Sequence, residues 1–141
     1  MYCDLDDLKN AVPEEVIIQL TDDDDTGSVD TDKTDSAMND AAELIDGYLR
    51  GRYTLPLAPT PEIVKRLSVD ISIYYLYQRR LDLTMPESLE NRYKNSIKLL
   101  EQIMKGQVTF AQTGDDIAGS LNLKVNKTSD DRLFTMDTMD F

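Results

Sequence analysis

Carboxylates are the residues of this sequence best placed to do chemistry, and the densest group is the run of four aspartates at residues 22–25. A calcium loop that starts at Asp22 would use Asp22 and Asp24 as ligands and Gly27 at its sharp turn. The same pattern needs an acidic bidentate ligand at position 33, where the chain has Lys33. We therefore expect a solvated loop, because adjacent carboxylates repel one another and glycine permits a positive φ.

Catalytic chemistry lacks its usual partners in this chain. There is no histidine, and Cys3 is the one cysteine. The commonest general base, a zinc site and an intramolecular disulfide are thereby removed. The glycines form no phosphate-binding motif and no nucleophile elbow, and the acids gather in loops and at helix starts, where solubility and capping explain them. We expect a protein that is not an enzyme and has no cofactor or metal, with Cys3 as a small apolar residue near the first helix.

The charge is unevenly distributed along the chain. Residues 1–46 carry a net charge of −13, residues 47–105 of +4 and residues 106–141 of −3, within a total of −12. This layout suits head-to-tail packing between copies, or a negative surface held away from nucleic acid. It argues against tight DNA binding by the whole chain, because affinity for phosphates needs clustered Lys and Arg.

The basic middle of the chain has two interpretations. Together with Tyr48 and Tyr53 its side chains could form a nucleic-acid-binding face. We favour compensation of helix ends and salt bridges to the acidic third of a neighbouring copy, because the net charge is strongly negative. The basic residues concerned are Arg50, Arg52, Lys65, Arg66, Arg79, Arg80, Arg92 and Lys94.

Apolar spacing predicts the helices that must position these residues. Two short helices open the chain, the first capped by Asp4 and the second beginning at Pro13-Glu14-Glu15. Three longer helices follow, and each shows apolar residues at the helical spacing i, i+3, i+4 and i+7. They are predicted from Thr31–Thr34 to Arg50-Gly51, from about Pro61 to Leu81 with Thr60 as cap, and from Pro86-Glu87 to Gly106.

The fourth helix is apolar on most sides, which predicts a central position covered by several neighbours. Tyr74, Tyr75 and Tyr77 are expected in its core-facing surface, with hydroxyls at polar partners. Before it, three prolines in residues 53–61 forbid a helix and favour an extended, polyproline-like path. Tyr53, Leu55 and Leu57 alternate in this proline segment, so one side of it is expected to lie on the helices.

The end of the chain has a different character. Residues 121–125 alternate apolar and polar side chains, as a strand does. The last nine residues are more apolar than a free tail requires, which favours an arm that docks on a neighbour. The predicted fold is mainly α: a compact bundle of about five helices at 1–105, and an extended C-terminal arm at 106–141 with a short β-hairpin or strand.

Four stretches of the sequence are distinctive: the opening MYCDLDDLKNAVPEEVIIQLTDDDDTGSVD, the segment IDGYLRGRYTLPL at 45–57, the segment VDISIYYLYQRR at 69–80 and the ending Phe134-Thr135-Met136-Asp137. They resemble the small morphogenesis proteins of Mu-like phages. The resemblance covers roughly residues 1–105, and the segment at 45–57 is its most specific part.

The resemblance implies a virion structural protein, namely a head–tail connector or head-completion protein of a tailed phage. Such proteins stack as a ring, often twelve-fold, in the neck between the portal protein and a tail-proximal neck or tail-terminator protein. DNA would pass through the channel without specific binding. Assembly would take place in the host cytoplasm, since no apolar run could span a membrane and the N-terminus does not read as a signal peptide.

Candidate residues follow for two kinds of surface. Acids lining the channel would repel phosphate. They are expected from part of the acidic first third or from the C-terminal acids, where the candidates are Asp115, Asp116, Asp130 and Asp131. Contacts with another subunit or partner are expected from Arg50, Arg52, Tyr53, Leu55, Arg79, Arg80, Leu133, Phe134, Met136, Met139 and Phe141. The alternative functions are a DNA-packaging accessory or regulatory protein that binds DNA through the basic middle, and a small enzyme, which would need a buried carboxylate pair.

Overall fold

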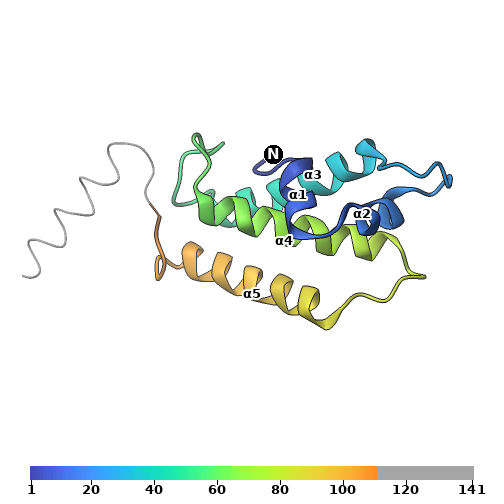
Figure 1. The fold of residues 1–141 in the computed structure, drawn as a ribbon. Helices are drawn as coiled ribbons and strands as arrows, with labels where there is room; N and C mark the ends of the chain where they lie inside the picture. The colour runs from blue at the N-terminus through green and yellow to red at the C-terminus, as the bar shows by residue number, and fades with distance from the viewer. Residues whose placement is uncertain (111–141) are drawn as a thin grey trace, which may run out of the picture. The chain divides into compact units, whose positions relative to one another are not determined.

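Five α-helices follow one another along residues 1–110, the part of the chain that the computed structural model describes (Figure 1). These residues contain no strand. The predicted helical fold is thus confirmed, whereas the strand predicted at 121–125 lies outside the described residues. The helices are α1 (Leu5–Ala11), α2 (Glu14–Thr21), α3 (Thr31–Leu49), α4 (Glu62–Arg79) and α5 (Glu87–Met104).

The three long helices α3, α4 and α5 pack together, and consecutive ones run in opposite directions (Figure 1). The short helices α1 and α2 pack on α3 and α4. Helix α4 contacts each of the other four, which confirms its predicted central position. As a result, the α2–α3 and α4–α5 loops meet at one end of the bundle, while the proline segment and the end of α5 lie at the other.

Two apolar clusters form the core, and α4 contributes to both. Val64, Leu67 and Ile71 belong to the cluster shared with α3, α5 and the proline segment. Val69, Ile73 and Leu76 belong to the cluster under α1 and α2. Tyr74, by contrast, is half-buried and stacks on Tyr93 of α5, with ring centroids 3.7 Å apart. Burial on opposite sides of one helix is why its sequence is apolar nearly all round.

Three of the five helices begin at a Pro-Glu pair. Pro13, Pro61 and Pro86 each occupy the N-cap position, and a glutamate follows as the first helical residue. Proline loses nothing here because the first N–H groups of a helix have no intrahelical partner, and the glutamate interacts favourably with the helix dipole. The predicted cap at Thr60 was wrong, since Pro61 occupies that position and no side chain caps α4.

Asp4 caps α1 as predicted. Its carboxylate accepts a hydrogen bond from the Asp7 N–H, and the Asp7 carboxylate accepts one from the Asp4 N–H, each at 3.0 Å. This reciprocal pair is a capping box, which satisfies two backbone donors.

The proline segment at residues 53–61 is bent instead of extended. Leu57 is 3% exposed, and Tyr53 and Leu55 pack on the same core cluster, so the predicted alternation is confirmed. The chain bends at 55–56 and again at 58–59, and both X-Pro peptide bonds there are cis. The polyproline-like path was therefore wrong, because a straight path of that kind turns its side chains around three faces and could not direct all three onto one core.

Candidate subunit-contact surfaces

The two ends of the bundle carry the charged residues of interest. We call one the acidic end; it comprises the end of α2 with the α2–α3 loop, residues 20–30, and the end of α4 with the α4–α5 loop, residues 79–86. The other is the basic end; it comprises residues 50–61 and 104–110. Helix α3 joins them and has 19 residues, so the two ends are about 28 Å apart along it.

At the acidic end, the first aspartate of the loop shapes the turn. The Asp22 carboxylate accepts hydrogen bonds from the N–H groups of Thr26 and Gly27 at 2.8 and 2.6 Å. These bonds lower the pKa of Asp22 below its usual value. Gly27 has the predicted positive φ, +80°. No group of three or more potential metal ligands comes together within residues 1–110.

Asp23 is the centre of an ion-pair network. Its carboxylate pairs with Lys33 at 3.0 Å, with Arg80 at 3.6 Å and with Arg79. Lys33, which stands where a calcium loop would need an acid, also pairs with Asp30 at 3.0 Å. The hydrogen bonds from Lys33 and Arg79 lower the pKa of Asp23. The network ties the loop to the ends of α3 and α4.

The same two arginines also cap α2. Arg79 donates to the carbonyl of Leu20 at 2.8 Å, and Arg80 donates to the carbonyl of Gln19 at 2.7 Å. Carbonyls in the last turn of a helix lack intrahelical partners, so a guanidinium there is stabilising. Both predicted contact residues thus have partners within the chain, and their contact with another protein stays a prediction.

The basic end has a different construction. Arg50, Arg52 and Lys105 are exposed there, and none of them forms an ion pair with another residue of the described range. The Arg52 guanidinium lies against Gly106, whose φ is +80° and whose Cα leaves so little room that a Cβ would lie 2.9 Å from Arg52 Cζ. Glycine at 106 therefore both ends α5 and lets this guanidinium approach.

Aromatic packing completes the basic end. The rings of Tyr53 and Phe110 stack with centroids 4.3 Å apart, and the Tyr53 hydroxyl accepts a hydrogen bond from the Phe110 N–H at 3.3 Å. Val108 and Phe110 pack on the core, so the helical unit continues to residue 110. Sequence reasoning singled out Gly106 as a helix end but missed Lys105 and Phe110 as neighbours of Arg52 and Tyr53.

The predicted contact residues are therefore divided between the two ends. Arg50, Arg52, Tyr53 and Leu55 gather at the basic end, whereas Arg79 and Arg80 lie at the acidic end. The remaining candidates lie outside the described residues: Leu133, Phe134, Met136, Met139 and Phe141 for contacts, and Asp115, Asp116, Asp130 and Asp131 for the channel.

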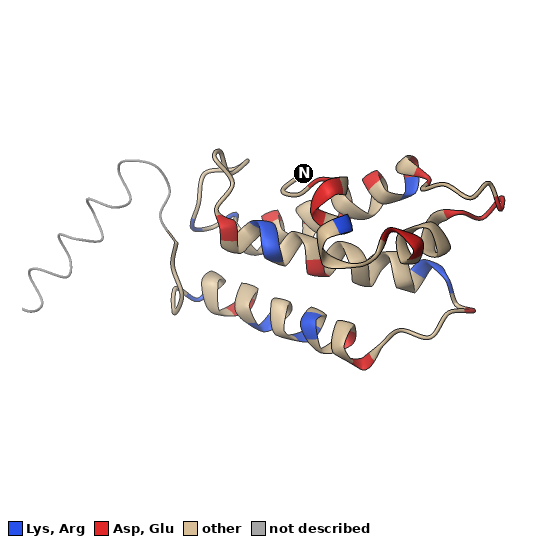
Figure 2. Cartoon of the chain, viewed as in Figure 1, with Lys and Arg blue, Asp and Glu red and all other residues tan. Residues whose placement is uncertain are grey.

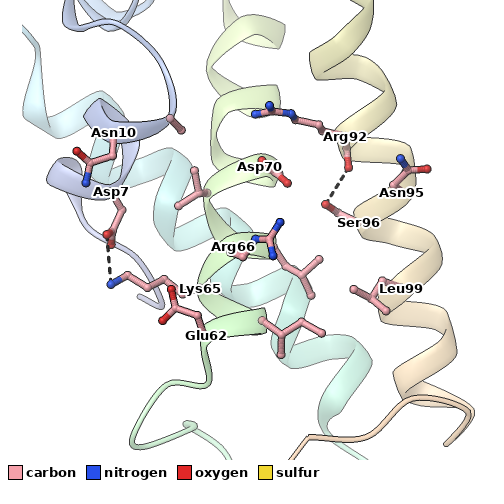
Figure 3. A pocket seen from close by; sticks show the side chains of 14 residues that line it. Asp7, Asn10, Glu62, Lys65, Arg66, Asp70, Arg92, Asn95, Ser96 and Leu99 are labelled. Atoms are coloured by element: carbon pink, nitrogen blue, oxygen red, sulfur yellow. Dashed lines mark hydrogen bonds and ion pairs between the residues drawn. The ribbon is translucent and has the colours of Figure 1, made fainter.

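A groove of about 640 Å³ runs between α1, α4 and α5 (Figure 3). The Asp70 carboxyl lies between the guanidinium groups of Arg66 and Arg92. Burial raises the pKa of Asp70, and the two arginines oppose that shift. Lys65 at the edge pairs with Asp7 at 3.2 Å. Three acids and three bases line the groove in all, so it has no net charge.

The basic residues of the middle segment do not gather on one face. Figure 2 shows them on α4, on α5 and in the loops, interspersed with acids. Lys65 pairs with Asp7, Lys94 pairs with Glu90 at 3.2 Å, and Arg79 is bound at the acidic end. This dispersal does not favour the continuous basic stripe that binding to duplex DNA needs.

Cys3 is buried against α4, as predicted for a small apolar residue. Its Sγ lies 3.3 Å from Ser68 Oγ and 3.9 Å from Ser72 Oγ. Burial raises the pKa of this thiol, so it stays protonated at neutral pH. Among the residues described, no helix combines the length and the apolar character that crossing a membrane requires.

Comparison with known proteins confirms the resemblance to the Mu-like phage family. A family model described as "Bacteriophage Mu, Gp36" matches residues 2–125. The Mu-like prophage FluMu protein gp36 of Haemophilus influenzae is 33% identical over 89 residues, which are 63% of this chain and 60% of that protein. Gene product J of Escherichia phage Mu is 31% identical over 81 residues, 57% of this chain and 55% of that protein. Each match spans less than two thirds of the relative's length.

Proposed function

The chain belongs to the Bacteriophage Mu Gp36 family, and we propose that it is a structural protein of the phage particle that acts as a head–tail connector. In this proposal its copies assemble into a ring between the portal protein and a tail-proximal neck or tail-terminator protein. Family membership carries the proposal, because the matched residues 2–125 include all five helices.

The two unlike ends of the bundle support assembly into a ring. Rings arise from heterologous contacts, in which one surface of a copy meets a different surface of the next. One end of this chain presents an aspartate-rich loop, and the other presents Arg50 and Arg52. Head-to-tail contact between copies would use both ends.

The proposal includes passive transit of DNA instead of specific binding. The net charge of −12 repels phosphate, and the bases of the middle segment are dispersed. The C-terminal residues, with Leu133, Phe134 and Met136 among them, are proposed to contact an adjacent subunit or partner. No catalytic role is part of the proposal.

Electron microscopy tests this function directly. Purified full-length chain, imaged by negative stain, should show closed rings whose copy number can be counted, and a labelled antibody should mark the neck of intact virions. A chain that stays monomeric at all concentrations and an antibody that leaves virions unlabelled would contradict the proposal.

One observation favours a second candidate function. Arg66 and Arg92 are exposed in the groove and form no ion pair with other residues of the described range, so they could bind phosphate. A DNA-packaging accessory or regulatory protein would use them in this way. Binding of duplex DNA that weakens steeply with salt, and that Arg66→Ala/Arg92→Ala abolishes, would support this candidate.

A further inference from the structure

Two carboxylates at the acidic end have no assigned role within the helical unit. Asp22 shapes its turn and Asp23 holds the ion-pair network, whereas Asp24 and Asp25 are exposed and make no ion pair with the other described residues. The dipole of α3 does not account for them, because Asp30 caps that helix and the dipole acts only within its first turn.

An exposed apolar side chain lies at the same end. Leu81 in the α4–α5 loop is 95% exposed, the highest value among the large hydrophobic residues of the described range. It follows Arg80, whose guanidinium pairs with Asp23 and Asp82 and so fixes the start of this loop. The acidic end thus presents free carboxylates together with an apolar side chain, so a partner of opposite charge that covers it would also remove apolar surface from water.

The basic end presents the complementary set. Arg50, Arg52 and Lys105 supply positive charge, and Met104 beside them is 44% exposed. Arginine and methionine are enriched at protein interfaces. Contact with Gly106 limits the freedom of the Arg52 guanidinium, so less conformational entropy is lost when it binds a carboxylate.

Geometry prevents one copy from pairing its own two ends. About 28 Å of α3 separates them, far beyond the reach of an ion pair. Within a homo-oligomer, the two ends can therefore meet only between different copies, and a repeated contact of this kind closes into a ring or extends as a filament.

We propose that the acidic end of one copy, through Asp24, Asp25 and Leu81, docks on the basic end of the next copy, at Arg50, Arg52 and Met104. This contact rests on the proposed self-assembly and names the surfaces that carry it. Because it joins exposed charges of opposite sign, it weakens as ionic strength rises.

A charge-swap experiment on the full-length chain tests the contact. Asp24→Lys/Asp25→Lys reverses one surface and Arg50→Glu/Arg52→Glu reverses the other. Each variant alone should self-associate at least about tenfold more weakly than wild type in sedimentation velocity, since close interfacial charge pairs couple strongly. An equimolar mixture should recover assembly, because its copies can alternate with every contact complementary, and a chain that carries all four changes should assemble by itself.

The control variant is Asp40→Lys/Glu43→Lys. It makes the same charge change on the exposed middle of α3 and should assemble like wild type. Wild-type rings that persist in both reversed variants overturn this contact and leave the proposed function standing. A mixture of folded variants that fails to recover assembly also overturns it. A wild-type chain that never self-associates overturns the contact, and virions that the antibody also leaves unlabelled overturn the proposed function as well.

Discussion

The acidic and basic ends of this bundle use charge in opposite ways. At the acidic end, Asp23 joins Lys33, Arg79 and Arg80, so most formal charges are bound within the chain. At the basic end, Arg50 and Arg52 form no ion pair with residues of the described range, and packing depends on the Tyr53–Phe110 stack and on apolar contacts.

The difference separates charges that fold the chain from charges that are free to assemble it. A charge bound within the chain should contribute to folding stability, and its removal should leave assembly intact unless the loop moves. An exposed charge without such a partner should matter little for folding. Substitutions at the two ends can therefore test this division.

Each end is supported by an apolar cluster of the core, so a cavity in either cluster should lower the free energy of unfolding of the chain by a similar amount. Leu57→Ala at the basic end and Leu20→Ala at the acidic end each remove a buried side chain, 3% and 0% exposed respectively. Each should lower the free energy of unfolding by about 2–5 kcal/mol in urea denaturation. Leu81→Ala, at a residue 95% exposed, is the matched control and should change it by less than about 0.5 kcal/mol. Equal effects of Leu57→Ala and Leu81→Ala would refute the packing described for the proline segment.

Substitution of two glycines by alanine should have opposite effects on stability, because only Gly106 has a backbone conformation that favours glycine. Gly106→Ala places a side chain at φ +80° and against the Arg52 guanidinium, so it should cost about 1–2 kcal/mol of unfolding free energy. Gly47→Ala lies inside α3 with nothing within 4 Å of its Cβ and should stabilise by up to about 1 kcal/mol. Thermal denaturation followed by circular dichroism measures the stability of both variants relative to wild type. Effects of the same sign would contradict the structure at Gly106.

Arginines at the two ends should differ in their effect on folding. Arg79→Met removes a partner of Asp23 and the hydrogen bond to the Leu20 carbonyl, and should lower the melting temperature measurably. Arg50→Met removes a charge without an ion-pair partner in the described range and should leave it nearly unchanged. Raising the salt concentration should shrink the difference between the two variants. A larger loss for Arg50→Met would reverse the proposed division of charges.

The smallest effects concern pH, and they have opposite directions for the aspartates of the acidic end and for Tyr2, which contacts Leu57 of the basic end. The pKa values of Asp22, Asp23 and Asp30 lie below the usual 3.8, so the stability they add is present above pH 3.8 and is lost as pH falls through the lowered values. Burial and the hydrogen bond to Asp46 raise the pKa of Tyr2, which also contacts the Leu57 N–H, to about 12. Its contribution is complete below pH 10 and is lost as pH rises through about 12.

Two conservative variants test which residues cause these changes of stability with pH. In chemical denaturation across pH, Asp23→Asn should reduce the loss of unfolding free energy at acid pH and leave the loss at alkaline pH unchanged. Tyr2→Phe should reduce the alkaline dependence alone. Identical profiles for Tyr2→Phe and wild type between pH 10 and 12 would mean that other tyrosines account for the alkaline loss.

Local patterns in the sequence predicted most of the fold. Apolar spacing placed the three long helices close to their observed bounds, and Asp4 and Pro13 marked the starts of the two short ones. Gly106 marked the end of α5 because a glycine takes positive φ readily. Where local rules competed, prediction failed: Thr60 is a good capping residue, but Pro61 holds the N-cap position.

The partners of the charged residues could not be predicted in the same way. Arg79 and Asp23 are 56 residues apart, and Tyr2 and Asp46 are 44 apart. Nothing in either local sequence specifies the other, since the packing of α2 and α4 brings the first pair together. The division of the candidate arginines into bound and exposed sets therefore became visible only in three dimensions.

Disulfide trapping tests most directly the claim that unlike ends of neighbouring copies meet. The full-length variant Asp24→Cys/Arg52→Cys keeps the buried Cys3, and its two new thiols are too far apart in one copy to bond. A ladder of covalent oligomers is expected under mild oxidation, with residues 24 and 52 of different copies joined in mass spectra. Asp40→Cys/Arg52→Cys should give no such ladder. Monomers alone from the first variant, under conditions in which wild type forms rings, would mean that these two ends do not meet.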